Sequence, residues 1–420
     1  MRIDRHYVSI ALALLLAPAI ARGGGYEIAE QGAAATSMAG AFTAKADDAS
    51  AIFYNAAGLA QLRGLHLYLG ATLVNSQVTA DDASKTFLPE GSAKTGVVAQ
   101  VMPNFYAAYG FSPGITLGIG IFSHYGLSLS WPSDWGGRSL VRDVTLRTVN
   151  ISPSIAWQVL PFLFIGGGID VISGSADLTR TMALDATTEA ELRFRGNDTA
   201  IGGNVGLLIV TPRKGAMPPI HLGFSYRTGP DLDFGGGRLS ISSPIELSQV
   251  LRDVRAAATV PMPDRIAVAL GVRPVDRLFL TAEFDWVHWS DFQSLTVTPT
   301  GGSLPPQTIP ENWRDGYTVR GAGEVLVGPV ALRLGAGFDW SPAAESTLNP
   351  IVPDSNRVFV GAGVGINLPR HLLIDIGLLG VDFLQRTSTL PQFPVEYSNW
   401  AVLTTVALGY RGKPGPATHP

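Results

Sequence analysis

Short segments in which apolar and polar residues alternate recur from residue 64 almost to the end of this chain. Residues 330–340, VALRLGAGFDW, place apolar side chains at even positions and Arg333 and Asp339 at odd positions. A period of two indicates a β-strand with one apolar and one polar face. Many of these segments carry ionised residues opposite the apolar face, which does not suit the core of a soluble sandwich. The pattern favours a barrel with a lipid-facing exterior and a polar lumen.

The alternating segments predict fourteen antiparallel strands, and an even number is typical of bacterial single-chain barrels. Short turns between some segments alternate with long loops, which is the usual asymmetry of such barrels. Five Trp residues near the predicted strand ends are interpreted as an interfacial girdle: Trp131, Trp135, Trp289, Trp340 and Trp400. The approximate strand spans are 64–79, 95–111, 115–130, 140–158, 162–180, 191–211, 219–233, 259–273, 277–297, 311–327, 329–341, 355–368, 371–387 and 395–411.

Composition agrees with a membrane barrel. Charged residues make up 15% of the chain, and its mean hydropathy is positive. After the N-terminal segment no run of 18 apolar residues follows, which excludes spanning helices. A closed barrel is the other structure that satisfies its backbone in lipid. The net charge of −4 gives no basic field for nucleic acid, and the absence of Cys removes disulfides and thiol chemistry.

Residues 1–21 have the features of a secretory signal peptide. Arg2 and Arg5 precede the apolar run 7–17, and Ala-Ile-Ala at 19–21 offers a small-residue cleavage site. The apolar run is too short to span a membrane. We therefore expect an exported protein whose mature chain begins near residue 22.

The segment that follows lacks strand alternation and is dominated by Ala, Gly and Ser. We predict that residues 22–63, the hatch, form a plug inside the barrel of residues 64–411, followed by a polar tail at 412–420. The hatch carries the acidic pair Asp47 and Asp48. Because buried carboxylates need partners, we expect this pair to bind lumenal Arg residues.

A helix is predicted in the longest loop, over residues 243–258. Ser243 is its N-cap, Pro244 lies in the first turn, and Glu246 completes a capping box. One interpretation is an apolar groove at the outer mouth that collects hydrophobic molecules, and the other is a helix that packs on its own loop. The apolar face of the predicted helix consists of Leu247, Val250, Leu251, Val254 and Ala258.

The sequence carries no motif that indicates catalysis. It lacks a Gly-x-Ser-x-Gly elbow, and its seven His residues show no metal-ligand spacing, so we expect no enzyme activity, metal or cofactor. Charged residues on the lumenal faces of the strands are best explained by binding to the hatch. They are Arg265, Arg273, Glu283, Asp285, Arg320, Glu324, Arg333 and Asp339.

Several short motifs resemble the FadL-type outer-membrane transporters of long-chain fatty acids and other hydrophobic compounds. The resemblance covers essentially the whole mature chain, and the order and spacing of the motifs make it specific. In the hatch the motifs are GYEI at 25–28, EQG at 30–32, ADDA at 46–49 and YNAAGL at 54–59. Later in the chain they are WSDF at 289–292, NWRDGY at 312–317, SP at 341–342 and PDSNR at 353–357.

This resemblance implies a hatch with an Asn-Pro-Ala motif beside a kink in the third strand, where ligand leaves sideways. Here the motif is Asn55, Ala56 and Ala57, without the proline, which should loosen the local geometry. Gly118 and Gly120 in the third strand are candidates for the kink. Glycines at these positions equally suit close packing against a plug.

The resemblance also implies an Arg near the end of the fifth strand that holds a ligand carboxylate. Arg180 matches this position, and its parity with Asp170 places it inward. The alternative is an Arg that pairs with Asp177 or with an acid of the hatch. The second basic contact of the family has no clean match, although Arg314 lies close in sequence.

The function that we expect is passive uptake of hydrophobic small molecules across the cell outer membrane. Ligand would be captured at the outer apolar groove, pass to a lumenal pocket and leave beside the hatch. An outer-membrane hydrolase and a general water-filled porin are the alternatives. Expected partners are the hydrophobic ligand, outer-membrane lipids and the barrel-assembly machinery, with the protein as a monomer and without nucleic acid.

Overall fold

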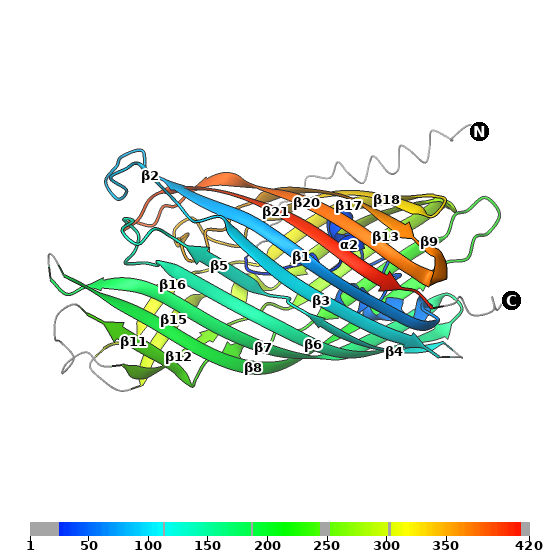
Figure 1. The fold of residues 1–420 in the computed structure, drawn as a ribbon, viewed down its shortest axis with the longest axis horizontal. Coiled ribbons are helices and arrows are strands. Elements are labelled where there is room, and N and C mark those ends of the chain that lie inside the picture. The colour runs from blue at the N-terminus through cyan, green and yellow to red at the C-terminus, as the bar shows by residue number, and fades with distance from the viewer. Residues whose placement is uncertain (1–24, 112–113, 186–187, 244–252, 301–303, 413–420) are drawn as a thin grey trace.

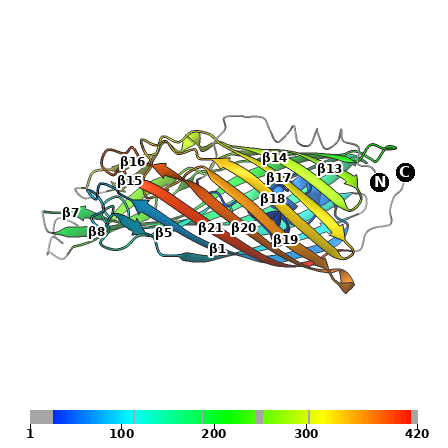
Figure 2. The same ribbon diagram turned by 90° about the horizontal axis from the view of Figure 1, so that it is seen from above.

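The computed structural model describes residues 25–111, 114–185, 188–243, 253–300 and 304–412. The expected signal peptide, the apolar positions Leu247, Val250 and Leu251, and the tail after residue 412 lie outside the described residues. The described chain forms a long antiparallel barrel whose strands are strongly tilted, with the hatch inside it (Figure 1). The same tilt is visible from above in Figure 2.

The barrel has fourteen strands, as the alternation predicted, and it is closed. Its last strand pairs with its first over a long ladder that runs from Leu67 opposite Tyr410 to Asp81 opposite Glu396. The strands are β1 (Gly64–Asp81), β3 (Val98–Gly110), β4 (Ile115–Phe122) continued by β5 (Gly126–Ser130), β6 (Asp143–Leu160), β7 (Leu163–Ala183), β8 (Glu189–Val210), β9 (Ile220–Arg227), β13 (Arg265–Val275), β14 (Leu278–Val287), β17 (Gly316–Val327), β18 (Val330–Trp340), β19 (Arg357–Asn367), β20 (Leu372–Thr387) and β21 (Glu396–Tyr410).

Short strands extend the wall at one end, which we call the loop end. They are β2 (Ser92–Lys94), β10 (Leu232–Asp233), β11 (Gly237–Ser242), β12 (Val254–Val260), β15 (Ser294–Thr300) and β16 (Gln307–Pro310). β11 pairs with β8 and β12, and β12 pairs with β15. Val254 and Ala258 therefore lie on a strand, so the prediction of a helix is wrong for this part of the loop. Cross-strand pairing beyond the barrel overrides the helix propensity of the alanines.

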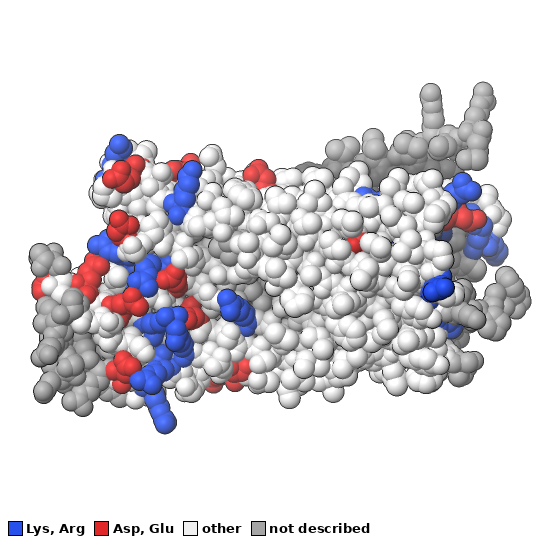
Figure 3. Space-filling model, viewed as in Figure 1, with Lys and Arg blue, Asp and Glu red and all other residues white. Residues whose placement is uncertain are grey.

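Apolar side chains cover the outside of the barrel. In β18 the exposed positions include Leu332 and Leu334, while Arg333 between them is 5% exposed. One face of the molecule shows a broad central band nearly free of charge, with ionised residues gathered towards the two ends (Figure 3). No helix among the described residues is long and apolar enough to cross a membrane.

Three of the five Trp residues contradict the predicted girdle, while Trp340 is half-buried. Trp131, Trp135 and Trp289 are buried, and the first two stack at a centroid distance of 4.2 Å inside an apolar cluster of the loop end. Trp400 is exposed at 40%. Proximity to a strand end could not distinguish a lipid-facing ring from one packed under a loop.

Inside the barrel, the hatch folds into three short helices: α2 (Ala33–Ser37), α3 (Ala51–Tyr54) and η1 (Ala56–Gln61). Glycines of the wall let it pack closely. A Cβ at Gly361 of β19 or at Gly377 of β20 would lie 2.6 or 2.5 Å from a backbone oxygen of α2. Small residues in these strands, Gly361 and Gly377 among them, therefore serve the contact with the plug.

Candidate ligand cavity beside a break in the barrel wall

The third strand of the barrel is interrupted at residues 123–125, between β4 and β5. β3 pairs with β4 from Phe105 to Gly110, while β5 pairs with β6 on its other side. At the loop end the two edges meet again, where the Gly96 N–H donates to the Ser130 carbonyl at 3.2 Å. Within the described chain, the wall between β3 and β5 thus lacks strand pairing over a bounded stretch, which we call the break.

The beginning of the described hatch pairs with the backbone of the break. The Ile28 N–H donates to the His124 carbonyl at 2.8 Å, and the Gly126 N–H donates to the Tyr26 carbonyl at 3.0 Å. Glu27 and Tyr125 form an antiparallel bridge. The hatch segment therefore supplies hydrogen-bond partners at the point where the wall strand is interrupted.

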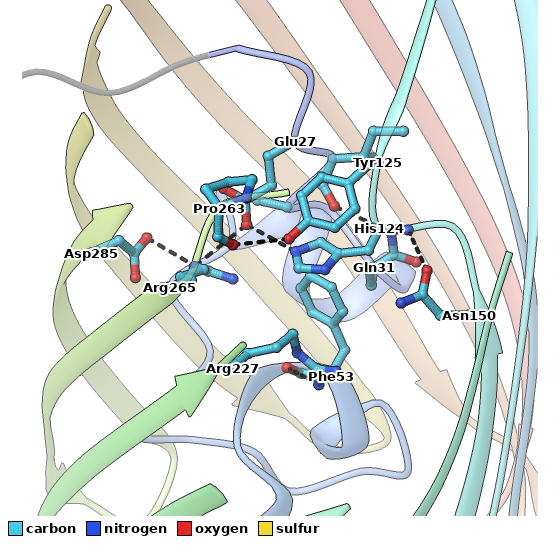
Figure 4. Close-up of polar contacts among 12 residues, drawn as sticks. Glu27, Gln31, Phe53, His124, Tyr125, Asn150, Arg227, Pro263, Arg265 and Asp285 are labelled. Atoms are coloured by element: carbon cyan, nitrogen blue, oxygen red, sulfur yellow. Dashed lines mark hydrogen bonds and ion pairs between the residues drawn. The ribbon is translucent and has the colours of Figure 1, made fainter. Parts of the chain in front are cut away.

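Side chains reinforce this contact (Figure 4). His124 Nε2 lies 3.0 Å from Glu27 Oε1, and Arg265 Nε lies 3.7 Å from the same oxygen. The Gln31 amide donates to the Ser123 carbonyl at 2.6 Å. Because these groups are largely shielded from water, the polar network stabilises one position of the hatch at the break.

A cavity of about 190 Å³ lies against the break. Gln100 and Met102 of β3 line one side of it, and Leu127 and Leu129 of β5 line the other. The lining is mainly apolar, and most of its charge lies close to the hatch. The remaining lining residues are Gly25, Glu27, Ile28, Glu30, Val74, Ser76, Gly126, Ser128, Arg320, Arg357, Phe359, Val381, Phe383, Ala401 and Leu403.

A second, smaller pocket of about 60 Å³ lies among residues from the loop end of the barrel. Its walls are almost wholly apolar, with Phe194, Phe292 and Val352 among them. Leu127 lines both this pocket and the cavity, and Tyr26 of the hatch lines the pocket. One wall residue thus borders both spaces, with the beginning of the hatch beside it.

The acidic pair of the hatch does not bind Arg residues, so this prediction is wrong. Asp47 pairs with Lys45 of the hatch, and Asp48 accepts hydrogen bonds from the N–H and the hydroxyl of Ser50. Lys45 Nζ instead reaches the wall, 3.3 Å from Glu324 Oε1. The hatch is anchored here by its cation, and its two carboxylates are satisfied locally.

The Asn55-Ala56-Ala57 motif lies against β7 and β8, and Phe53, two residues before it, packs on His124 of the break with ring centroids 5.0 Å apart. The Asn55 amide donates to the carbonyls of Thr43 and Leu207 at 3.0 Å each, and its oxygen accepts from the Ala57 N–H at 3.2 Å. A Cβ at Gly206 would lie 2.1 Å from this oxygen. The motif therefore fixes the turn between α3 and η1 to the wall.

Gly118 and Gly120 lie within β4, before the interruption. A Cβ at either position would lie 3.0 Å from the Ile52 side chain of the hatch. These glycines thus allow the hatch to pack closely against β4. Of the two interpretations of the sequence, a kink or close packing, they fit close packing. The interruption itself follows Phe122.

Arg180 and Arg314, the two residues expected to bind a ligand carboxylate, do not line the cavity. Arg180 Nη2 donates to Gln307 Oε1 at 2.6 Å, and neither Asp177 nor a hatch acid is its partner. Asp177 instead pairs with Arg193 and Arg195. Arg314 is exposed in the segment between β16 and β17.

The sequence did not single out His124 or Glu30 as site residues. Glu27 and Glu30 belong to the motifs that carried the family resemblance, which was a signal for the hatch as a whole. His124 is one polar residue in an otherwise continuous strand pattern, and nothing in that pattern marks the interruption. Among the described residues, no group of His, Asp and Glu is arranged to hold a metal ion.

Comparison with known proteins agrees with this architecture. The family described as "Outer membrane protein transport protein (OMPP1/FadL/TodX)" matches residues 14–408. A long-chain fatty acid transport protein of Salmonella typhi is 22% identical over 364 residues, which cover 79% of this chain and 81% of the relative.

Two solved structures share the fold. A FadL homologue of Pseudomonas aeruginosa superposes with a TM-score of 0.80 at 18% identity, covering 92% of this chain and all of the other. The toluene transporter TbuX of Ralstonia pickettii gives a TM-score of 0.69 at 19% identity, with coverage of 91% and 98%. The match across nearly the whole chain, on a closed barrel that contains a hatch, shows that this protein belongs to the OMPP1/FadL/TodX family of outer-membrane transport proteins.

Proposed function

We propose that the protein carries hydrophobic small molecules inward across the outer membrane by passive diffusion. The observation that carries this proposal is the cavity whose apolar walls come from both edges of the break. Sites for small molecules are typically concave and mostly apolar, with few polar groups. A cavity bordered by β3 and β5 provides such a site next to unpaired wall.

The route begins in the apolar pocket at the loop end. Leu127 is common to this pocket and to the cavity, so a ligand that passes Leu127 and Tyr26 reaches the cavity. From there the break leads sideways into the lipid, once the hatch segment around Glu27 yields. A lateral route suits a ligand that is more soluble in lipid than in water.

The ligand class is hydrophobic small molecules, and the names of the relatives indicate long-chain fatty acids and toluene for those proteins. Arg180 supports capture of a carboxylate at the loop end, because its described partner, Gln307, is neutral. The exposed Arg314 would contribute only at long range. Val254 and Ala258 are the members of the expected outer groove that the structure describes, and Ala258 lines the apolar pocket at the loop end.

The protein acts without catalysis, as a monomer that contacts outer-membrane lipids and is inserted by the barrel-assembly machinery. A hydrolase is disfavoured because the sequence carries no nucleophile motif. A water-filled porin is disfavoured because buried side chains of the hatch occupy the lumen, among them Phe42, Ile52 and Tyr54. Large, steady conductance in planar bilayers would overturn this view.

Uptake of radiolabelled fatty acid and toluene should be compared in strains with and without the gene. Ala401→Phe places a large ring in the cavity and should lower uptake several-fold. Ala71→Phe, at an exposed position of β1, is the matched control and should leave uptake unchanged. Equal uptake with and without the gene would overturn the proposal.

A further inference from the structure

We propose that the cavity beside the break selects hydrophobic molecules with a hydrogen-bond-donating head group, a hydroxyl or an ammonium, over molecules with a carboxylate. Glu30 of the hatch is the residue that discriminates between them. This inference rests on the proposed function and assigns the chemistry of the ligand head group in the same cavity.

Four charged side chains line the cavity, and both of its cations are already neutralised. Arg357 Nη2 lies 2.5 Å from Asp339 Oδ2, and Arg357 Nε donates to the same oxygen at 2.7 Å. Arg320 Nη1 makes a short contact with Asp285. A ligand carboxylate would have to compete with these two acids for a cation. The Arg320 Nε–H has no hydrogen-bond partner among the described residues, but it is fully buried, so neither Arg offers an accessible carboxylate site.

The two acids that line the cavity differ in their partners. Glu27 is paired with His124 and Arg265. Among the residues that the structure describes, no donor hydrogen-bonds to the Glu30 carboxylate and no cation lies within 4.0 Å of it. Arg320 and Arg357 are close enough to influence Glu30 electrostatically, but each is paired elsewhere.

An acceptor without a partner in a confined cavity favours a donor. A ligand hydroxyl or ammonium would donate a hydrogen bond to the Glu30 carboxylate, which has no donor among the described residues. A ligand carboxylate has no proton to donate and would instead approach a second carboxyl group. Among ligands with apolar bodies of equal length, the cavity therefore favours those whose head group can donate a hydrogen bond and carries no negative charge.

The shape of the cavity limits the rest of the ligand. Its volume of about 190 Å³ is below the roughly 300–1,000 Å³ of pockets that hold drug-sized ligands. Met102, Phe359 and Leu403 contribute to an apolar lining that suits a slim alkyl or aryl body. Alkyl alcohols, alkylamines and phenols combine such a body with a donor head.

The test uses the full-length mature protein in nanodiscs of zwitterionic lipid and three probes of equal chain length: octylamine, octanol and octanoate. Binding is measured by equilibrium dialysis of the radiolabelled probe, with partition into empty nanodiscs subtracted. Glu30→Gln removes the charge and keeps the shape of the side chain. Glu90→Gln, in an exposed loop, removes the same charge far from the cavity and is the matched control.

We expect wild type and Glu90→Gln to bind octylamine and octanol at least tenfold more tightly than octanoate. In Glu30→Gln the preference for octylamine over octanoate should fall by about tenfold or more. Octanoate binding equal to that of octylamine in wild type, or an unchanged ratio in Glu30→Gln, would overturn the inference and leave the proposed function standing. Failure of all three probes to bind above empty nanodiscs would overturn both.

Discussion

His124 Nε2 lies 3.0 Å from Glu27 Oε1 and thereby joins the interrupted wall strand to the first described residues of the hatch. Both side chains are nearly buried, and the backbone of the same two segments is also paired. This contact holds the hatch across the break, where ligand is proposed to leave. Its strength should therefore control how often the break is uncovered.

Replacing His124 by Ala should loosen the hatch segment at the break. Glu27 would keep Arg265 at 3.7 Å but lose its nearest partner, and a buried charged group without such a partner costs about 1–3 kcal/mol. We expect amide hydrogen exchange in residues 25–31 to accelerate by about tenfold or more. His371→Ala, in an exposed turn, serves as the control, and equal exchange in wild type and His124→Ala would contradict this role.

Replacing Lys45 by Met should weaken the anchor between the hatch and the wall. Lys45 and Glu324 are 4% and 5% exposed, and Glu324 would retain only Arg333 as its described cationic partner. The contact between hatch and wall should lose about 1–3 kcal/mol of its stability. This weakening should appear as brief conductance openings in planar bilayers. Lys85→Met, in an exposed loop, should give none. If Asp47→Asn leaks more than Lys45→Met, the assignment of the anchor to Lys45 is wrong.

Restoring proline to the hatch motif by Ala56→Pro should be tolerated. Ala56 is the first residue of η1, where proline suits a helix, and Asn55 before it is extended at φ −162° and ψ 99°. The variant should gain about 0.4–1 kcal/mol in its free energy of unfolding, because the unfolded chain loses freedom. Urea unfolding in detergent measures this change. A clearly lower midpoint would show that the ring does not fit beside Gly206.

Because of Glu311, the free energy of unfolding should fall as pH rises, through the loop end where this residue lies. Burial raises the pKa of its carboxyl from the ordinary 4.5 to about 8, against hydrogen bonds from Asn349 at 3.0 Å and Trp313 at 3.1 Å. Between these two pH values the unfolded chain has released a proton that the folded one still holds, so stability falls with pH and then levels above about 8. The urea midpoint of wild type should therefore fall between pH 5 and pH 8 relative to that of Glu311→Gln. Parallel pH profiles of the two proteins would contradict this expectation.

The barrel could be predicted from the sequence because lipid and lumen impose opposite polarity on neighbouring residues. Arg333 illustrates this, since it is buried between Glu324 and Asp375 as its parity required. Outside the membrane no such rule holds, and the loop residues 254–258 were assigned to a helix although they form part of β12. The direct partners of Asp47 and Asp48 were missed because residue type alone does not show whether a hatch acid or a hatch cation contacts the wall.

The family resemblance implied a kink in the third strand, but the position of the break at residues 123–125 could not be predicted because its cause is not local. Residues 115–130 keep the alternation of one strand, and the strand is interrupted where the hatch backbone pairs with it in place of β3. Glu30 was overlooked for a related reason. Only the three-dimensional arrangement shows that Arg320 and Arg357 are paired with acids while Glu30 is not.

Hydrogen bonds between neighbouring strands close a barrel around its circumference, and in this barrel they are missing between β3 and β5 over part of its height. β3 is bonded to β4 from Phe105 to Gly110 and is free of β5 beyond that point until Gly96 meets Ser130. We therefore expect lateral pressure from the bilayer to act mainly at the break, where no strand pairing shares it. The thickness and tension of the surrounding membrane should then affect the width of the break, through which ligand is proposed to leave.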